Sequence, residues 1–286
     1  MYELLNSIKR KILWLTLISQ LAITTWSVGQ SAGSNGSTML WYAKPATQWL
    51  EALPIGNGRM GGMLFGGIRT EHLQVNDQSL VTGTTQKVGY YQPFGDVFVE
   101  LDSAGTIRNY RRELNLQNAV HTVRYESNGV QFVRTAFASF PDQVQVLHVS
   151  ASKPGQLTGT IRLTDAHQAL VRVEDGKLVA TGTLENGMIH ESQVRVVAKG
   201  GRVSVSPAGI RVNQATTVTV LLAVGTSFVN DESLNFVGQH PHQRLNNQLE
   251  KAAKKSIDQL MSAHTLDYQS LFGRVHLQLG VSGTEA

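Results

Sequence analysis

The chain contains no cysteine among its 286 residues. Its absence excludes disulfide bonds, thiol catalysis and lipid attachment to an N-terminal cysteine. An excess of one charge is also missing, because 25 Lys and Arg against 21 Asp and Glu leave a formal net charge of only +4. After residue 40 no run of basic residues alternates with aromatics. Neither nucleic acid nor an anionic membrane is therefore expected as a partner.

The N-terminus has the three parts of a secretory signal. Basic residues at 9–11 precede an apolar run over 12–28, and small residues follow from Gly29. A single membrane anchor is the alternative, but polar residues interrupt the run, which falls short of the ~20 apolar residues that a span prefers. We expect residues 1–30 to be a signal peptide and residues 31–39 a flexible leader. The protein would then be exported, to the periplasm or the extracellular space, with no stable membrane anchor after cleavage.

Alternation of apolar and polar residues dominates from Trp41 to about Phe228. Short alternating runs are punctuated by turn signals that are typical of β-hairpins. Three such signals are Ser127-Asn128-Gly129, Asp175-Gly176 and Gly200-Gly201. Strands at this density indicate antiparallel sheets packed face to face. The fold class predicted is mainly β, with one large antiparallel, supersandwich-like β-sandwich over residues 40–235.

The periodicity changes near Pro241. Apolar residues from Leu245 to Leu260 recur three or four positions apart, with polar residues between them, which predicts an amphipathic helix. We expect His264-Thr265 to interrupt this helix, and a second short helix to run from Thr265 to about Gly273. Residues 240–286 are therefore predicted to form C-terminal linker helices.

A glycine-rich stretch precedes these strands. Gly56, Gly58 and Gly61 fit the G-x-G-x-x-G pattern of dinucleotide-binding loops, and Asp77 follows at about the expected distance. That pattern requires a helix after the glycines. Residues 63–67 carry two further glycines, and the sequence after them alternates as a strand does. We predict that the glycines serve turns and close backbone approach, and that no nucleotide cofactor binds.

No catalytic or metal-binding constellation stands out. His240 and His242 flank Pro241, which disfavours the helical geometry that would align two ligands, so we expect exposed side chains at a helix start. Glycoside hydrolysis needs an acid and a base flanking the bond. Carboxylates such as Asp165 fall instead at strand ends, as ordinary solvated acids do. The sequence predicts no catalytic residue, no metal site and no cofactor in this chain.

Aromatic residues gather around the glycine-rich stretch: Trp41, Tyr42, Trp49, Tyr90, Tyr91 and Phe94. Such side chains stack on sugar faces as well as fill cores. Packing in a core or between domains is the expectation, with sugar contact as the alternative.

Several long stretches, in order from Leu40 to about Gly280, resemble the N-terminal region of glycoside hydrolase family 95, the inverting α-L-fucosidases. They are LWYAKPATQWLEALPIGNGRMGGMLFGG, LQVNDQSL, GYYQPFGDVFVEL, YRRELNLQNA and HTLDYQSLFGRVHLQLG. The resemblance implies a large N-terminal β-sandwich, a helical linker, an (α/α)6 barrel that holds the active site, and a C-terminal β domain. Val81 is a departure, since the family usually has tryptophan there.

By this resemblance, a glutamic acid that donates a proton and an asparagine–aspartate arrangement that activates water belong to the barrel. No position of this chain matches those motifs. The resemblance thus implies a sandwich segment that ends before its catalytic barrel, is inactive alone, packs against that barrel and meets fucosylated glycans through the full-length enzyme. Asn57, Arg59, Asn76 and Asp77 are the candidates for reaching the barrel mouth, with hydrogen bonding between domains as the alternative.

Two other functions are compatible with these residues. One is an independent carbohydrate-binding β-sandwich. The other keeps the family but changes the sugar to an α-L-galactoside, because selectivity would reside in the barrel.

Overall fold

The computed structural model describes residues 38–102 and 105–275. The expected signal peptide, most of the leader and the last residues of the linker lie outside this part of the chain. No helix among the described residues is long and apolar enough to cross a bilayer.

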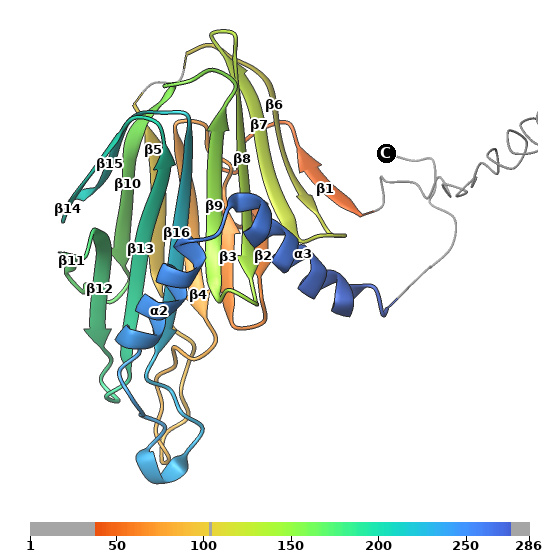
Figure 1. Cartoon of the computed structure of the whole chain (residues 1–286). Helices are drawn as coiled ribbons and strands as arrows, with labels where there is room; N and C mark the ends of the chain where they lie inside the picture. Colours follow the sequence, from red (N-terminus) through yellow and green to blue (C-terminus); the bar gives the residue numbers. More distant parts are fainter. Residues whose placement is uncertain (1–37, 103–104, 276–286) are drawn as a thin grey trace, which may run out of the picture. The chain divides into compact units, whose positions relative to one another are not determined.

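The described residues form two antiparallel sheets (Figure 1). Sheet A has nine strands, in spatial order β1 (Met39–Tyr42), β6 (Ile107–Asn115), β7 (Val120–Ser127), β8 (Val130–Ser139), β9 (Val144–Ala151), β16 (Thr217–Thr226), β13 (Ile189–Lys199), β12 (Lys177–Thr183) and β11 (Val171–Glu174). Sheet B has seven, in the order β14 (Arg202–Ser206), β15 (Gly209–Ala215), β10 (Leu157–Asp165), β5 (Gly95–Leu101), β4 (Thr70–Asp77), β3 (Met60–Leu64) and β2 (Leu53–Gly56). The predicted mainly β architecture with helices after the strands is confirmed.

Two of the three predicted hairpins are confirmed. Asn128-Gly129 joins β7 to β8 and Asp175-Gly176 joins β11 to β12, and all four turn residues have positive φ, as type I′ turns require. The third prediction is wrong, because Gly200-Gly201 carries the chain from β13 in sheet A to β14 in sheet B. Both glycines have φ near 70°, and a Cβ on Gly201 would lie 2.1 Å from the Asn213 carbonyl oxygen.

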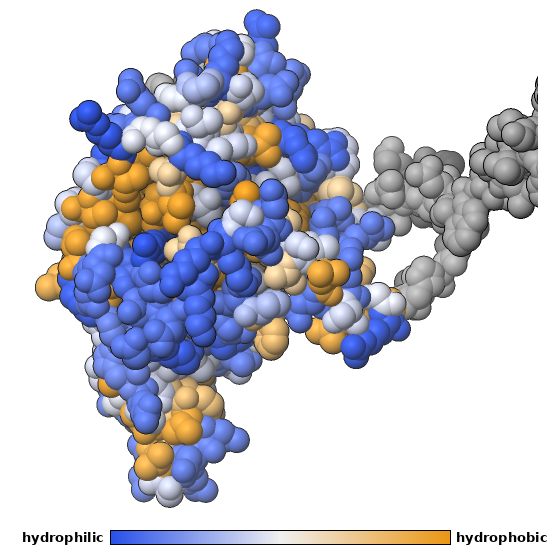
Figure 2. Space-filling model, in the orientation of Figure 1, coloured by the Kyte–Doolittle hydropathy of each residue, from blue (hydrophilic) through white to orange (hydrophobic). Residues whose placement is uncertain are grey.

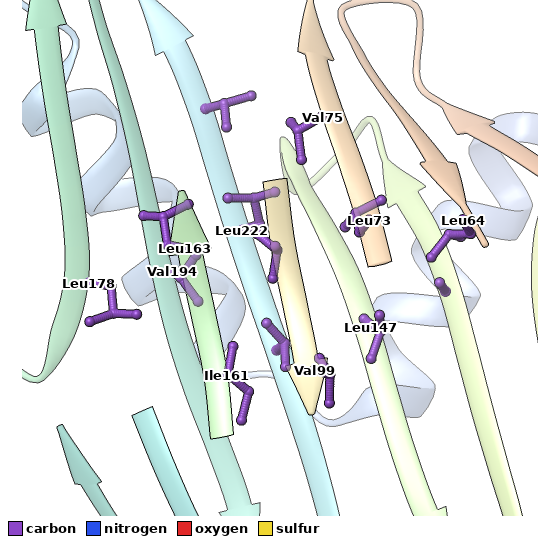
Figure 3. Packing of buried hydrophobic residues seen from close by; sticks show 14 of the residues in the cluster. Leu64, Leu73, Val75, Val99, Leu147, Ile161, Leu163, Leu178, Val194 and Leu222 are labelled. Carbon is purple, nitrogen blue, oxygen red and sulfur yellow. The ribbon is translucent and has the colours of Figure 1, made fainter. Parts of the chain in front are cut away.

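The core lies between the two sheets. Alternate residues of each strand point inward, so Leu73 and Val75 of β4 share one cluster with Leu147 of β9 and Leu222 of β16 (Figure 3). Each of these side chains is almost fully buried, which contributes roughly 1.5–3 kcal/mol apiece by apolar transfer. Alternation in the sequence therefore translates directly into the face-to-face packing.

Two helices, α2 (His242–Ala253) and α3 (Ile257–Phe272), cover the outer face of sheet A (Figure 1). Leu245, Leu249 and Leu260 pack there against a second apolar cluster that includes Phe137 and Leu221. The predicted apolar stripe is confirmed, and α2 and α3, the two α-helices of the described residues, both pack on sheet A.

The predicted interruption of the helical segment is wrong. His264-Thr265 lies inside α3, and the break falls at Lys254–Ser256 instead. Ser256 accepts a hydrogen bond from the Gln259 backbone N–H, while the Gln259 side chain accepts one from Ser256 N–H. This reciprocal capping box satisfies two backbone donors that the helix leaves unpaired, and so starts α3 early.

Candidate functional site

The glycine-rich stretch folds as a hairpin between β2 and β3. Asn57 Oδ1 accepts hydrogen bonds from the backbone N–H groups of Arg59 at 3.1 Å and Met60 at 2.9 Å. Gly58 has a φ of 87°, which favours glycine. A strand and not a helix follows the glycines, as the alternating sequence predicted. Gly61 differs from the expectation, since its φ is not positive and a Cβ there would meet only the Ile55 oxygen, at 3.9 Å.

Arg59 and Asp77 form an ion pair between this hairpin and the end of β4. The Asp77 side chain is fully buried and that of Arg59 is 19% exposed. Arg59 also crosses to sheet A: its Nε donates to Gln143 Oε1 and its Nη1 to the Val224 carbonyl, each at 2.8 Å. Asp77 Oδ1 accepts from the backbone N–H of Ser79 at 2.9 Å. The pair thus ties the two sheets together at one end of the sandwich.

The ion pair between Arg59 and Asp77 lies next to the first residues of two loops. Ser79 Oγ, at the start of the β4–β5 loop, lies 2.7 Å from Thr226 Oγ1, at the start of the β16–α2 loop. Arg244 of α2 donates to the Thr226 carbonyl at 3.1 Å. Burial lowers the pKa of the Arg59 guanidinium, the Asp77 carboxylate opposes that shift, and the positive charge of Arg244 adds to it. Removing the Asp77 charge would therefore leave a largely buried cation without its counter-ion.

Asn57 and Asn76 lie apart from this ion pair. The Asn57 side chain donates to the Ser139 carbonyl at 3.1 Å and so also bridges the sheets. Asn76 is exposed on the outer face of sheet B, where its Oδ1 accepts from the Asp77 N–H at 2.8 Å. Of the four candidate residues from the sequence, two are joined in a buried ion pair, Arg59 and Asp77. The other two, Asn57 and Asn76, line two different clefts at the surface.

Three clefts open near this end of the sandwich. The helix cleft, of about 490 Å³, is lined by Gly56, Asn57, Gly58, Ala138, Phe140, His264, Asp267, Tyr268, Leu271 and Phe272. The loop cleft, of about 400 Å³, is lined by Val81, Thr82, Gly83, Thr84, Lys87, Val88, Gly89, Tyr91, Asn186, Met188, Phe228 and Phe236. The sheet cleft, of about 370 Å³, is lined by Trp49, Pro54, Ile55, Gly61, Gly62, Met63, Gln74, Val75, Asn76, Tyr91, Gln92 and Pro93.

The loop cleft is lined mainly by residues of the β4–β5 and β16–α2 loops, the two long loops that extend beyond the sheets in Figure 1. Asn186 joins them to the body by donating to the carbonyl groups of Val81 at 3.1 Å and Gly83 at 2.9 Å. Figure 2 shows hydrophobic surface at the tip of these loops, where Val88 and Leu234 are exposed. Val81 lines this cleft and is not among the buried residues of the sandwich core.

The described residues that line the clefts do not include a pair of carboxylates. Among the described residues that line these three clefts, Asp267 is the only carboxylate, and a pair is required. No group of three or more His, Asp or Glu side chains within the described ranges could hold a metal ion. In the part of the chain that the structure describes, these clefts offer space for a ligand but carry no pair of carboxylates.

Two side chains expected in solvent instead take part in histidine–carboxylate contacts. His242 is only partly exposed, and its two ring nitrogens lie 2.9 Å from oxygens of Glu174 and Glu191. The Asp165 carboxylate is buried and lies 3.0 Å from His190 Nε2. Burial raises the pKa of Asp165, but the hydrogen bond and charge of His190 and the hydrogen bonds from the backbone N–H groups of Ala169 and His167 together outweigh it, so the net pKa is lowered. The expected exposure of both groups is corrected, because residues far apart in the sequence cover them.

Sequence reasoning missed Gln143, Thr226 and Arg244, which complete the ion-pair cluster. Ser79 carried a weak signal, since Asp77-Gln78-Ser79 is a turn-forming sequence. The other three carry none, because their partners are distant in the sequence: Gln143, in the β8–β9 turn, lies 84 residues beyond Arg59, and Thr226 lies 147 residues beyond Ser79. Arg244 joins the cluster only through Thr226.

The family match covers nearly the same residues as the β-sandwich. A family model described as "Glycosyl hydrolase family 65, N-terminal domain" matches residues 40–89 and 81–231. Alpha-L-fucosidase 2 of Arabidopsis thaliana is 28% identical over 86% of this chain and 37% of its own length. A probable alpha-fucosidase A of Aspergillus niger is 24% identical over 80% of this chain and 36% of its own length. The chain thus spans less than half the length of either relative.

A solved structure shares the fold. A putative kojibiose phosphorylase from the human microbiome superposes with a TM-score of 0.51 at 12% identity, covering 82% of this chain and 38% of that one. At this identity the likeness concerns the fold alone.

Proposed function

The chain belongs to the family described as glycosyl hydrolase family 65, N-terminal domain, and from this membership we propose that it serves as the N-terminal β-sandwich of an exported α-L-fucosidase-like hydrolase. The observation that carries the proposal is the family match across residues 40–231 together with two relatives named as alpha-fucosidases. Fucosylated glycans are the proposed substrates of the whole enzyme.

Catalysis is assigned in this proposal to sequence that the relatives have and this chain does not span. The chain covers 37% of the Arabidopsis relative, and its clefts lack an acid–base pair among the described residues. The reacting carboxylates of an inverting hydrolase stand about 6.5–9.5 Å apart across the bond. The sandwich would then support a separate catalytic barrel and would not hydrolyse glycans alone.

The helix cleft is the proposed contact with that barrel. Leu271 and Phe272 of α3 are 59% and 44% exposed, and Phe140 beside them is 52% exposed. Contiguous apolar surface of this kind marks interaction sites. The Asn57-Gly58 turn lines the same cleft, which gives it a place at the domain boundary without any role in catalysis.

The test exchanges the aligned N-terminal region of the Arabidopsis relative for residues 38–275 of this chain. The chimera is expected to release fucose from 2′-fucosyllactose, whereas the relative without its N-terminal region is expected to lose activity. A folded chimera without activity would argue against the proposal. The 286-residue chain alone should release no fucose, and release that a carboxylate substitution within this chain abolishes would overturn the assignment of catalysis.

Export is proposed from the basic and apolar segments at residues 9–28. The mature protein is expected to begin near residues 30–34, in the periplasm or outside the cell. N-terminal sequencing of the exported fraction checks this, and an intact Met1 in that fraction would contradict it.

A further inference from the structure

The sheet cleft combines features that fit a sugar ring. Trp49 and Tyr91 stand at its rim with 53% and 72% of their surfaces exposed. Gln74, Asn76 and Gln92 add amide groups. Large exposed aromatics offer a flat apolar face, while an amide both donates and accepts hydrogen bonds. A pyranose has a matching apolar face and a ring of hydroxyl groups.

The aromatic rim is built into the fold. Trp49 begins the short 3-10 helix η1 (Trp49–Glu51). Arg112, which is buried, donates to the carbonyl groups of Lys44 at 2.8 Å and Glu51 at 2.7 Å, and so holds this turn on both sides. The indole is therefore presented by a braced turn and not by a loose loop.

The opposite rim is held equally well. Tyr91 pairs with Val81 in a β-bridge, and the backbone N–H of Gln92 donates to the Leu80 carbonyl at 2.9 Å. Leu80 and Phe94, on either side of this pairing, are fully buried. The phenol thus projects from a segment whose ends are anchored in the core.

The floor of the sheet cleft leaves space for a ligand and carries amide groups that can hydrogen-bond to it. Outward positions of β3 and β4 carry Gly61 and Gln74, and the direction in which a Gly61 Cβ would point is open except for the Ile55 oxygen at 3.9 Å. No hydrogen bond to a described residue occupies the Gln74 amide, and Asn76 uses its oxygen but not its nitrogen. Polar groups are therefore available to a ligand.

The ligand is expected to be uncharged, because no Lys, Arg, Asp or Glu occurs among the described residues that line the sheet cleft. We propose that the sheet cleft binds a neutral pyranose ring of a glycan, stacked on Trp49 or Tyr91 and hydrogen-bonded to Gln74 and Asn76. The ligand class rests on the proposed function. The site faces away from α2 and α3, which cover sheet A, and it is separate from the helix cleft.

The test titrates the purified chain with L-fucose, L-galactose, lactose and 2′-fucosyllactose, using saturation-transfer NMR and tryptophan fluorescence. We expect saturable millimolar binding of at least one sugar. At least one of Trp49→Ala and Tyr91→Ala should weaken it by about tenfold or more, through the loss of the stacking face. Gly61→Val should abolish it by filling the floor, in a direction where the fold leaves space.

Matched controls separate the cleft from general surface effects. Trp41 and Tyr90 are 55% and 73% exposed but line none of the three clefts, so Trp41→Ala and Tyr90→Ala should leave binding unchanged. Lys87→Ala alters the loop cleft alone and should also be silent. Circular dichroism and thermal melting verify that each variant is folded.

Absence of binding to every sugar would overturn the inference, as would binding that survives Trp49→Ala, Tyr91→Ala and Gly61→Val. If Trp49→Ala and Tyr91→Ala both lower the activity of the chimera without changing sugar binding, the cleft is a contact between domains and the inference also falls. Sugar binding is measured without hydrolysis. An inactive chimera with intact binding would therefore refute the proposed function alone.

Discussion

The ion pair between Arg59 and Asp77 offers a sharp test of what holds the two sheets together. Asp77→Asn keeps the shape of the side chain and removes its charge, so the Arg59 guanidinium, 19% exposed, loses its counter-ion. Breaking a buried pair by changing one partner costs about 3–5 kcal/mol, because the remaining charge stays buried. We expect the lower end of that range, about 3 kcal/mol, since Arg59 retains some solvent contact.

The matched control uses the same substitution at an exposed pair. Asp102 and Arg211 form an ion pair with side chains 45% and 37% exposed. Exposed pairs contribute about 0.2–1 kcal/mol, so Asp102→Asn should change the free energy of unfolding by less than about 1 kcal/mol. Both variants are compared with the wild type by urea denaturation followed by circular dichroism, with the slope m checked for constancy.

A double-mutant cycle completes the measurement. Arg59→Met removes the charge that Asp77→Asn leaves uncompensated, so the double variant should lose much less stability than the sum of the two single variants. Equal losses for Asp77→Asn and Asp102→Asn, or strict additivity in the cycle, would show that the pair does not couple the sheets.

Two further predictions concern pH and the glycine-rich turn. Burial, together with the charges of Arg134 and Arg112, lowers the pKa of His121 to about 3 in the folded protein, whereas the pKa in the unfolded chain is ~6.5. Between these pH values the unfolded chain binds more protons than the folded protein. The stability contribution of neutral His121 is therefore complete above pH ~6.5 and is lost as the pH falls toward ~3. His121→Gln should flatten that part of the unfolding free energy, as measured by denaturation at a series of pH values, and an unchanged slope would contradict the assignment. Gly58→Ala should lower the melting temperature through ~1–2 kcal/mol of strain at its φ of 87°, whereas Gly61→Ala should not; equal losses would contradict this contrast.

Local sequence patterns predicted the strands of the sandwich well, because the residues of each strand or hairpin turn determine its local conformation. Asn128-Gly129 adopts positive φ at both positions and joins neighbouring strands of one sheet. Gly200-Gly201 adopts similar dihedral angles yet connects different sheets. The backbone dihedral angles of a turn depend on its own residues, whereas the sheet that β14 joins depends on its pairing with β15. A turn signal therefore predicts a reversal but not the sheet that the chain enters.

The break between α2 and α3 shows the same limit within a helical segment. The apolar stripe runs through Leu249 and Leu260 without a phase change that marks the break. Ser256 and Gln259 form a capping box whose sequence signature was available. His264 was taken as an interruption, but both of its ring nitrogens contact backbone carbonyl oxygens of sheet A and the β6–β7 turn. A polar residue on a buried helix face was thus mistaken for a break.

The clefts depend on contacts that no single segment specifies. Alternation along β4 places Gln74 and Asn76 on the outward face from the sequence alone. It does not show that Trp49 stands beside them, because the indole is positioned by Arg112 from β6, 61 residues beyond Glu51. Alternation also turns Asp77 inward, but it does not show that Ser79, which Asp77 contacts, lies beside Thr226, 147 residues further along the chain. The strand β4 therefore supplies outward residues that line the sheet cleft and an inward residue that anchors the β4–β5 and β16–α2 loops. The partners of both sets of residues are known only from the packing of the two sheets.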